Sequence, residues 1–131
     1  MGCDIHAVIE INPFVEKGEN EEDILWHGVV VIEIDREYNF FSLLAGVRQS
    51  SKDFDPIKPL AGIPNPHSFT YDGLLEIWEG DGYSHSYYTF EELKISKYYN
   101  YYKNHLFFKI MEMLTKDYGT NSTRIVFFFD N

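Results

Sequence analysis

The sequence lacks several features that would assign it to a class at once. It has a single cysteine, Cys3, so it forms no internal disulfide and shows no CxxC or zinc-knuckle spacing. No run approaches the about 18 apolar residues of a membrane-spanning helix, and no basic segment followed by an apolar one opens the chain. We therefore expect a soluble protein of a reducing cytoplasm that does not bind a membrane.

Positive charge is also scarce. The 131 residues include 11 lysines and arginines against 21 acidic residues, which gives a formal net charge of −10. This balance disfavours a nucleic-acid polymer as partner, because phosphate backbones require a basic surface. A small phosphorylated ligand needs only about two or three placed cations, so the charge does not exclude one.

Motifs of common enzyme classes are absent. The sequence contains no GxGxxG, P-loop, HExxH or GxSxG. A two-histidine phosphoesterase would show two H-x-[ST] repeats, whereas His6 is followed by Ala7 and Val8, and Ser86 directly follows His85. His, Cys, Asp and Glu form no compact ligand cluster, so we expect neither a metal nor another cofactor.

Apolar and aromatic residues are abundant, at 44% and 18% of the chain. At this length they predict a single domain over residues 1–131. Strand patterns at both ends and helical patterns between them predict an α+β fold, in which an antiparallel sheet (an N-terminal hairpin plus a C-terminal strand) is covered by three or four helices. The expected strands are 1–12, 24–34 and 124–131, and the expected helices are 36–47, 72–79, one from Thr89 with a capping box to Glu92, and 98–116.

The opening segment MGCDIHAVIEI alternates between apolar and polar residues. In a strand, Cys3 and Ile5 would lie on one face, and Asp4 and His6 on the other. Cys3 is then a small buried hydrophobe rather than a nucleophile. Asp4 and His6 either face water or line a site, and the spacing alone favours the solvated face.

Other candidate residues lie near the expected ends of elements. The three arginines, Arg36, Arg48 and Arg124, suit bidentate contact with phosphate or carboxylate, although each could simply pair with an acidic residue. His85 and Ser86 lie in a glycine-bearing segment, 80–86, that we expect to be a loop. We expect a second, proline-rich loop over residues 49–67, and structural roles for His27, His67 and His105.

Several motifs together carry a resemblance. They are MGCDIH at residue 1, Arg36-x-Tyr38, LAGVR at 44–48, GIP at 62–64, HS…T…EL from His85 to Leu93, and RIVFFFDN at 124–131. In this order the sequence resembles a family of small proteins encoded by bacteriophages and prophages, over nearly the whole chain. The resemblance implies a complete phage accessory protein that acts in the cytoplasm of a bacterial host.

The resemblance also implies that the polar residues of these motifs form one ligand-binding site. That site would comprise Asp4, His6, Arg36, Arg48, His85, Ser86, Arg124 and Asp130. If the first and last strands are neighbours, Arg124 and Asp130 lie on the same side of the sheet as Asp4 and His6. The strands would then form the floor of the site, and the loops 49–67 and 80–86 its walls.

Three functions remain open. The protein could be a counter-defence binding module that sequesters a small phosphorylated signal, of the ADP-ribose or cyclic-nucleotide type. It could instead be a phosphodiesterase that cleaves such a signal, with His6 and His85 as acid and base. The third alternative is an acidic protein–protein inhibitor, but its acidic residues are spread along the chain rather than gathered. The sequence leaves the oligomeric state open, including a homo-oligomer.

Overall fold

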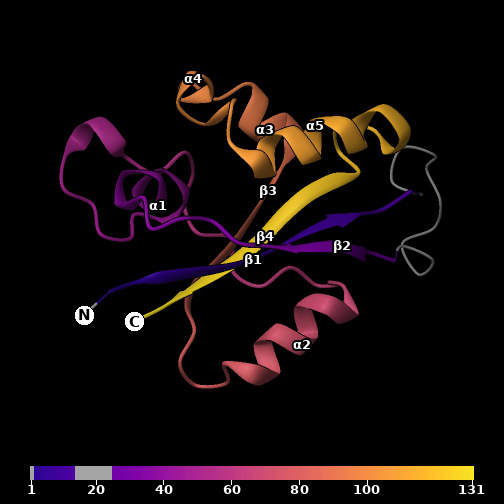
Figure 1. Ribbon diagram of the computed structural model, residues 1–131, viewed down its shortest axis with the longest axis horizontal. Coiled ribbons are helices and arrows are strands. Elements are labelled where there is room, and N and C mark those ends of the chain that lie inside the picture. The colour runs from indigo at the N-terminus through magenta and orange to yellow at the C-terminus, as the bar shows by residue number, and fades with distance from the viewer. Residues whose placement is uncertain (1, 14–24) are drawn as a thin grey trace.

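The computed structural model describes residues 2–13 and 25–131, and these form a four-stranded sheet with helices on both faces (Figure 1). The α+β prediction is confirmed. The strands are β1 (Asp4–Ile11), β2 (His27–Ile32), β3 (Tyr83–Thr89) and β4 (Thr123–Asp130). The helices are α1 (Tyr38–Ala45), α2 (Phe69–Ile77), α3 (Phe90–Lys94), α4 (Tyr99–Tyr102) and α5 (Leu106–Tyr118), with a 3-10 turn, η3 (Lys52–Phe54).

The first and last strands are neighbours, which is the condition under which the sequence placed Arg124 and Asp130 on one side of the sheet with Asp4 and His6. The sheet is antiparallel with the order β2-β1-β4-β3, so β1 and β4 form its centre. In their register Asp4 lies opposite Asp130, and His6 lies opposite Phe128. Because paired residues share a face, Asp4 and His6 lie on the same side of the sheet as Asp130 and Arg124.

The larger core lies on the other side of the sheet. There the odd residues of β1 and β4 pack under α1, α3, α4 and α5. Cys3 is fully buried in this layer, so its placement on the apolar face is confirmed. Phe127 and Phe129 contribute from β4, where every residue is buried.

A smaller apolar cluster covers part of the face that carries Asp4 and His6. Val8, Val126 and Phe128 pack there against Tyr71 and other residues of α2, which Figure 1 shows alone on this side of the sheet. The sheet face that carries Asp4 and His6 is therefore only partly exposed to solvent, because α2 covers its middle. The polar residues at its two ends lie beside a packed helix.

Two expected element boundaries are wrong. His85 and Ser86 belong to strand β3 rather than to a loop, because residues 83–89 pair with β4. The register shifts between Tyr83 and Ser86, and Ser84 has a φ of 54°, so this strand lacks the regular alternation by which a strand is recognised.

The expected helix 98–116 is interrupted. α4 ends at Tyr102, and α5 begins after His105, which is its N-cap residue. The Tyr102 hydroxyl donates a hydrogen bond of 2.5 Å to the carbonyl of Leu93, and this buried contact holds the chain at the break. Propensity gives no signal for such a tertiary contact.

The helices are short in comparison with a membrane span. α5, with 13 residues, falls below the about 20 apolar residues that cross a bilayer. No helix within residues 2–13 and 25–131 is both long and apolar enough for that role.

Candidate functional site

The imidazole of His6 lies at the centre of a cluster of rings and one carboxylate. Its Nε2 is paired with Oδ2 of Asp130, the residue that ends β4. Its ring lies 4.4 Å from the ring of Trp78 and 5.2 Å from that of Phe128, measured between centroids. An imidazole with a carboxylate on one nitrogen is held in a fixed orientation, which suits it for binding or for proton transfer.

A second imidazole, that of His85, lies on the other side of Phe128. The centroid of the His85 ring lies 5.2 Å from that of Phe128, the same distance as for His6. The centroids of the two imidazoles are therefore separated by at most twice that distance. Nδ1 of His85 is buried and has no hydrogen-bond partner within the described part of the chain. Burial lowers the pKa of His85, which favours the neutral imidazole.

A small hollow opens beside these rings. Its volume is about 170 Å³, and its walls include Ile63, Leu75, Trp78, Gly82, His85 and Phe128. Trp78 and Phe128 give these walls aromatic surfaces that suit a planar ring, and Glu79 and His85 add polar groups. Ile63 comes from the segment 49–67, so this loop supplies a wall of the hollow.

A larger groove lies on the other side of His6. It has a volume of about 390 Å³ between the start of β1 and the chain that follows β2, and its polar lining residues are Asp4, His6, Glu33, Asp35 and Arg36. Trp78 stacks on His6 and also lines the hollow, so the His6–Trp78 pair separates the two spaces.

Asp4 and Arg36 form a bidentate ion pair at the mouth of this groove. Nε and Nη2 of Arg36 donate hydrogen bonds of 2.7 and 3.0 Å to the Asp4 carboxylate. The hydrogen bonds from Arg36 hold the pKa of Asp4 below its usual value. A Cβ at residue 2 would lie 2.0 Å from Nη1 of Arg36, so Gly2 allows the guanidinium to lie against the backbone.

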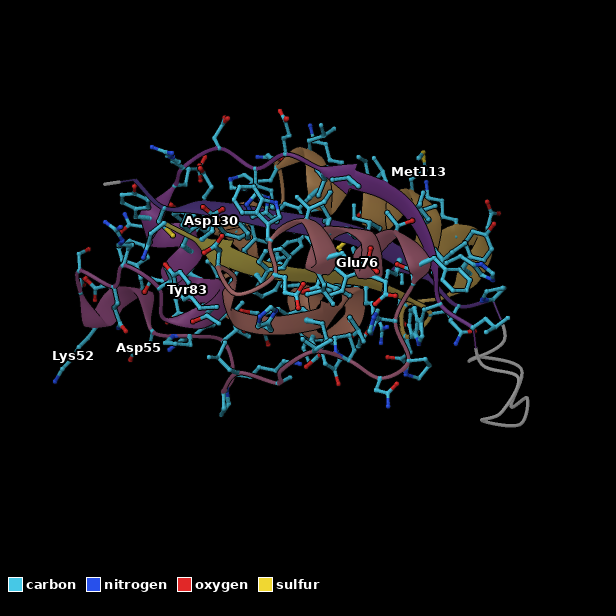
Figure 2. All side chains as sticks on the ribbon, turned by 90° about the horizontal axis from the view of Figure 1, so that it is seen from below. Lys52, Asp55, Glu76, Tyr83, Met113 and Asp130 are labelled. Carbon is cyan, nitrogen blue, oxygen red and sulfur yellow. The ribbon has the colours of Figure 1, made fainter. Side chains whose placement is uncertain are left out.

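Arg48 reaches the same end of the sheet from the α1 layer. Its Nη2 lies 3.4 Å from Oδ1 of Asn131, and its guanidinium lies 5.3 Å from the Tyr38 ring. Tyr83 also donates a hydrogen bond of 2.9 Å to Asn131, and Figure 2, seen from the α2 side, shows Tyr83 and Asp130 toward this end. Arg48 is thus close to the chain end that carries Asp130.

Two of the eight candidate residues, Arg124 and Ser86, are buried and bound to groups that are not among the candidates. Arg124 is only 5% exposed, and its Nε donates a hydrogen bond of 2.7 Å to the fully buried Glu10. Its Nη2 donates to the carbonyl of Pro66, and its guanidinium stacks 3.7 Å from the ring of Trp26. Ser86 is buried and accepts a hydrogen bond of 3.0 Å from the Ala61 amide.

These contacts give Arg124 and Ser86 structural roles. Glu10 also accepts a hydrogen bond of 2.7 Å from the Ser68 amide, so the Glu10–Arg124 pair holds the chain on both sides of His67. The Ser86 hydroxyl holds the same loop at Ala61. The site proposed below is therefore built without these two residues.

The structure brings the remaining six candidates to one end of the sheet and adds Trp78. Sequence analysis gave Trp78 no role, since its contact with His6 depends on where α2 docks. The only available signal was its rarity, as one of two tryptophans in the chain. Within the described residues, no group of three or more His, Cys, Asp or Glu is arranged to hold a metal ion.

Comparison of the chain with protein-family models, curated proteins and solved structures gave no match. The functional argument therefore depends on the residues of this site.

Proposed function

We propose that this protein is a bacteriophage accessory protein that binds and sequesters a small phosphorylated, nucleotide-derived immune signal in the host cytoplasm. The observation that carries the proposal is the position of His6 and Trp78, which lie between a hollow lined by aromatic rings and a groove lined by charged side chains. A nucleotide has the same division, with a planar base joined to a polar sugar and phosphate.

The hollow fits the base. The rings of Trp78 and Phe128 offer stacking surfaces, and stacking on an aromatic side chain is worth about 1–3 kcal/mol per base. The unpartnered Nδ1 of His85 provides a polar group at the edge of this hollow.

The groove fits the sugar and the phosphate. The carboxylate of Asp4 lines the groove and can accept hydrogen bonds from ribose hydroxyls, while Asp130 orients His6. Arg36 supplies a cation in the groove and Arg48 a second cation at the same end of the sheet, and a phosphate would compete with Asp4 for the two donors of Arg36. This set of cations is sufficient for a small ligand in a protein of net charge −10.

The test measures depletion and recovery of defined probes. ADP-ribose and a cyclic dinucleotide are each mixed with the protein, the protein is removed by filtration, and the free probe is quantified. We expect depletion of one probe and recovery of that probe intact after the protein is denatured by heat.

Variants connect depletion to the site. Trp78→Ala removes a stacking surface and Arg36→Ala a phosphate donor, so each should weaken binding, the latter by about 1.5–3 kcal/mol. Arg48→Ala should have an effect of the same size. His105→Ala, in the layer on the other side of the sheet, is the control that should bind normally. Normal binding by the Trp78 and Arg36 variants would contradict the proposal.

One observation favours a second candidate, cleavage of the same signal. His6 is oriented by Asp130, while burial favours neutral His85, and the two rings flank Phe128. A phosphodiesterase could use neutral His85 as the base and protonated His6 as the acid. Recovery of a cleaved probe from the wild-type protein, but not from His85→Ala, would show that the protein cleaves the signal rather than sequestering it. No depletion of either probe would favour the inhibitor function.

A further inference from the structure

A basic segment interrupts this otherwise acidic chain. Residues 93–111 contain no aspartate or glutamate, so all 21 acidic residues lie elsewhere. The same segment contains four of the 11 cationic side chains. These are Lys94, Lys97, Lys103 and Lys109, which we call the α4 basic patch.

The fold gathers these lysines on one part of the surface. Nζ of Lys94 lies 6.0 Å from the ring of Phe90, and Nζ of Lys103 lies 6.0 Å from the ring of Tyr99. Both rings pack on Phe108, at centroid distances of 4.9 and 5.6 Å. Figure 1 shows α3, α4 and α5 together on the side of the sheet opposite α2.

The two other lysines extend the patch. Lys97 lies 5.1 Å from the ring of Tyr98, next to Tyr99, and Lys109 follows Phe108 in α5. All four lysines are exposed. Their ammonium groups are therefore available to a partner, while the rings beneath them are fixed by the core.

Exposed apolar side chains accompany the charges. Ile95 is 72% exposed, Leu106 65% and Tyr101 40%, and all three lie within the same acid-free segment. At this exposure, Ile95 and Leu106 are not part of the hydrophobic core. Exposed aliphatic and aromatic side chains grouped in this way are typical of a protein-binding surface rather than of a site for a small ion.

We propose that the α4 basic patch is a docking surface for an acidic face of another protein. Charge complementarity identifies the partner as acidic, with lysines meeting carboxylates around apolar contacts at Ile95, Tyr101 and Leu106. The rings of Trp78 and Phe128 in the site of the proposed function lie on the other side of the sheet, and the patch shares no residue with that site.

Two other occupants are disfavoured by the same observations. A nucleic-acid strand would leave the exposed aliphatic side chains of Ile95 and Leu106 without a matching apolar group. A second copy of this chain in a twofold dimer would place the patch against itself, lysines facing lysines.

The test uses the full chain and a defined acidic polypeptide, a random copolymer of glutamate and tyrosine. Binding is measured by fluorescence anisotropy at increasing salt, with an oligothymidylate as the nucleic-acid comparison. We expect saturable binding of the polypeptide that weakens as salt rises, and no binding of the oligothymidylate.

Matched charge reversals locate the binding surface. Lys94→Glu and Lys103→Glu should each weaken binding of the copolymer by roughly fivefold or more, because each removes an attraction and adds a repulsion. Lys116→Glu is the control, since this exposed lysine is also in α5 but lies between Glu112 and Asp117. Circular dichroism verifies that each variant is folded.

Three results would overturn the proposal. They are equal affinity of the Lys103→Glu and Lys116→Glu variants, tighter binding of the oligothymidylate than of the polypeptide, and no binding of the polypeptide by the wild-type protein at low salt. The last result does not depend on any variant being folded.

Discussion

The Glu10–Arg124 pair is the part of the molecule where removal of one side chain should cost the most stability. Both residues are buried, and Arg124 is enclosed by Trp26, Glu10 and Pro66. Arg124→Ala leaves the Glu10 carboxylate buried without its counter-charge. We expect the free energy of unfolding to fall by about 3–5 kcal/mol, measured by urea denaturation.

The double variant Glu10→Gln, Arg124→Met is the control for this prediction. It removes both charges, so no uncompensated ion remains, and it should lose less stability than Arg124→Ala. If Arg124→Ala instead had normal stability but reduced ligand affinity, Arg124 would belong to the binding site rather than to the structural framework.

His67 should make stability depend on pH. Burial opposes protonation, but hydrogen bonds to Asp72 (3.0 Å) and to the Pro64 carbonyl (2.8 Å) raise the pKa of His67 above its ordinary value overall. A raised pKa contributes stability that is fully present below the unfolded value of about 6.5 and is lost as the pH rises through the folded value.

The test compares wild type with His67→Gln by thermal denaturation at about pH 5.5 and about pH 8. The midpoint difference between the two proteins should be larger at the lower pH. A difference that is equal at both values, or larger at the higher one, would show that protonation of His67 does not stabilise the fold.

Single residues also show how far sequence reasoning reaches. The alternation in β1 predicts the burial of Cys3 and the shared face of His6 and Asp130, because a strand's geometry is local. It cannot predict that Trp78 stacks on His6 or that Glu10 neutralises Arg124. Both contacts depend on how α2 and its preceding loop dock on the sheet.

At the scale of elements, local signals predict some structure and miss what tertiary pairing creates. The capping box of Thr89 and Glu92 is confirmed at the start of α3. Strand β3 was missed, since its bent start at Ser84 is stabilised by pairing with β4 and not by its own composition.

The close approach of α2 to β2 provides a test at this scale. A Cβ added at Gly28, in β2, would lie 2.4 Å from Oγ1 and 2.5 Å from Cβ of Thr70, in α2. Gly28→Ala must therefore push the helix away from the strand. We expect a loss of about 1–3 kcal/mol in the free energy of unfolding, the usual cost of overpacking.

Gly73→Ala is the matched control within α2. A Cβ there meets nothing within 4 Å, and alanine favours a helix over glycine by about 0.8–1.0 kcal/mol. This variant should be more stable than wild type by a similar amount. Equal effects of the two substitutions would contradict the close contact between Gly28 and Thr70.

For the whole molecule, the sheet separates two surfaces of different chemistry. The hollow lies on the side of α2, the groove lies between the start of β1 and the chain after β2, and the α4 basic patch lies in the layer opposite α2. The central strands β1 and β4 are buried between these layers and pair along their full length. A rigid centre of this kind carries both surfaces without requiring that one alter the other.

The last prediction is that the two surfaces can be inactivated one at a time. Trp78→Ala should weaken binding of the nucleotide probe and leave binding of the glutamate–tyrosine copolymer within about twofold of wild type, because no charge of the patch is changed. Lys103→Glu should do the reverse. Isothermal titration of each variant with each probe measures all four affinities. If either variant loses both activities while its far- and near-ultraviolet circular dichroism stay native, the two surfaces are coupled through the sheet, and the separation argued from the fold is wrong.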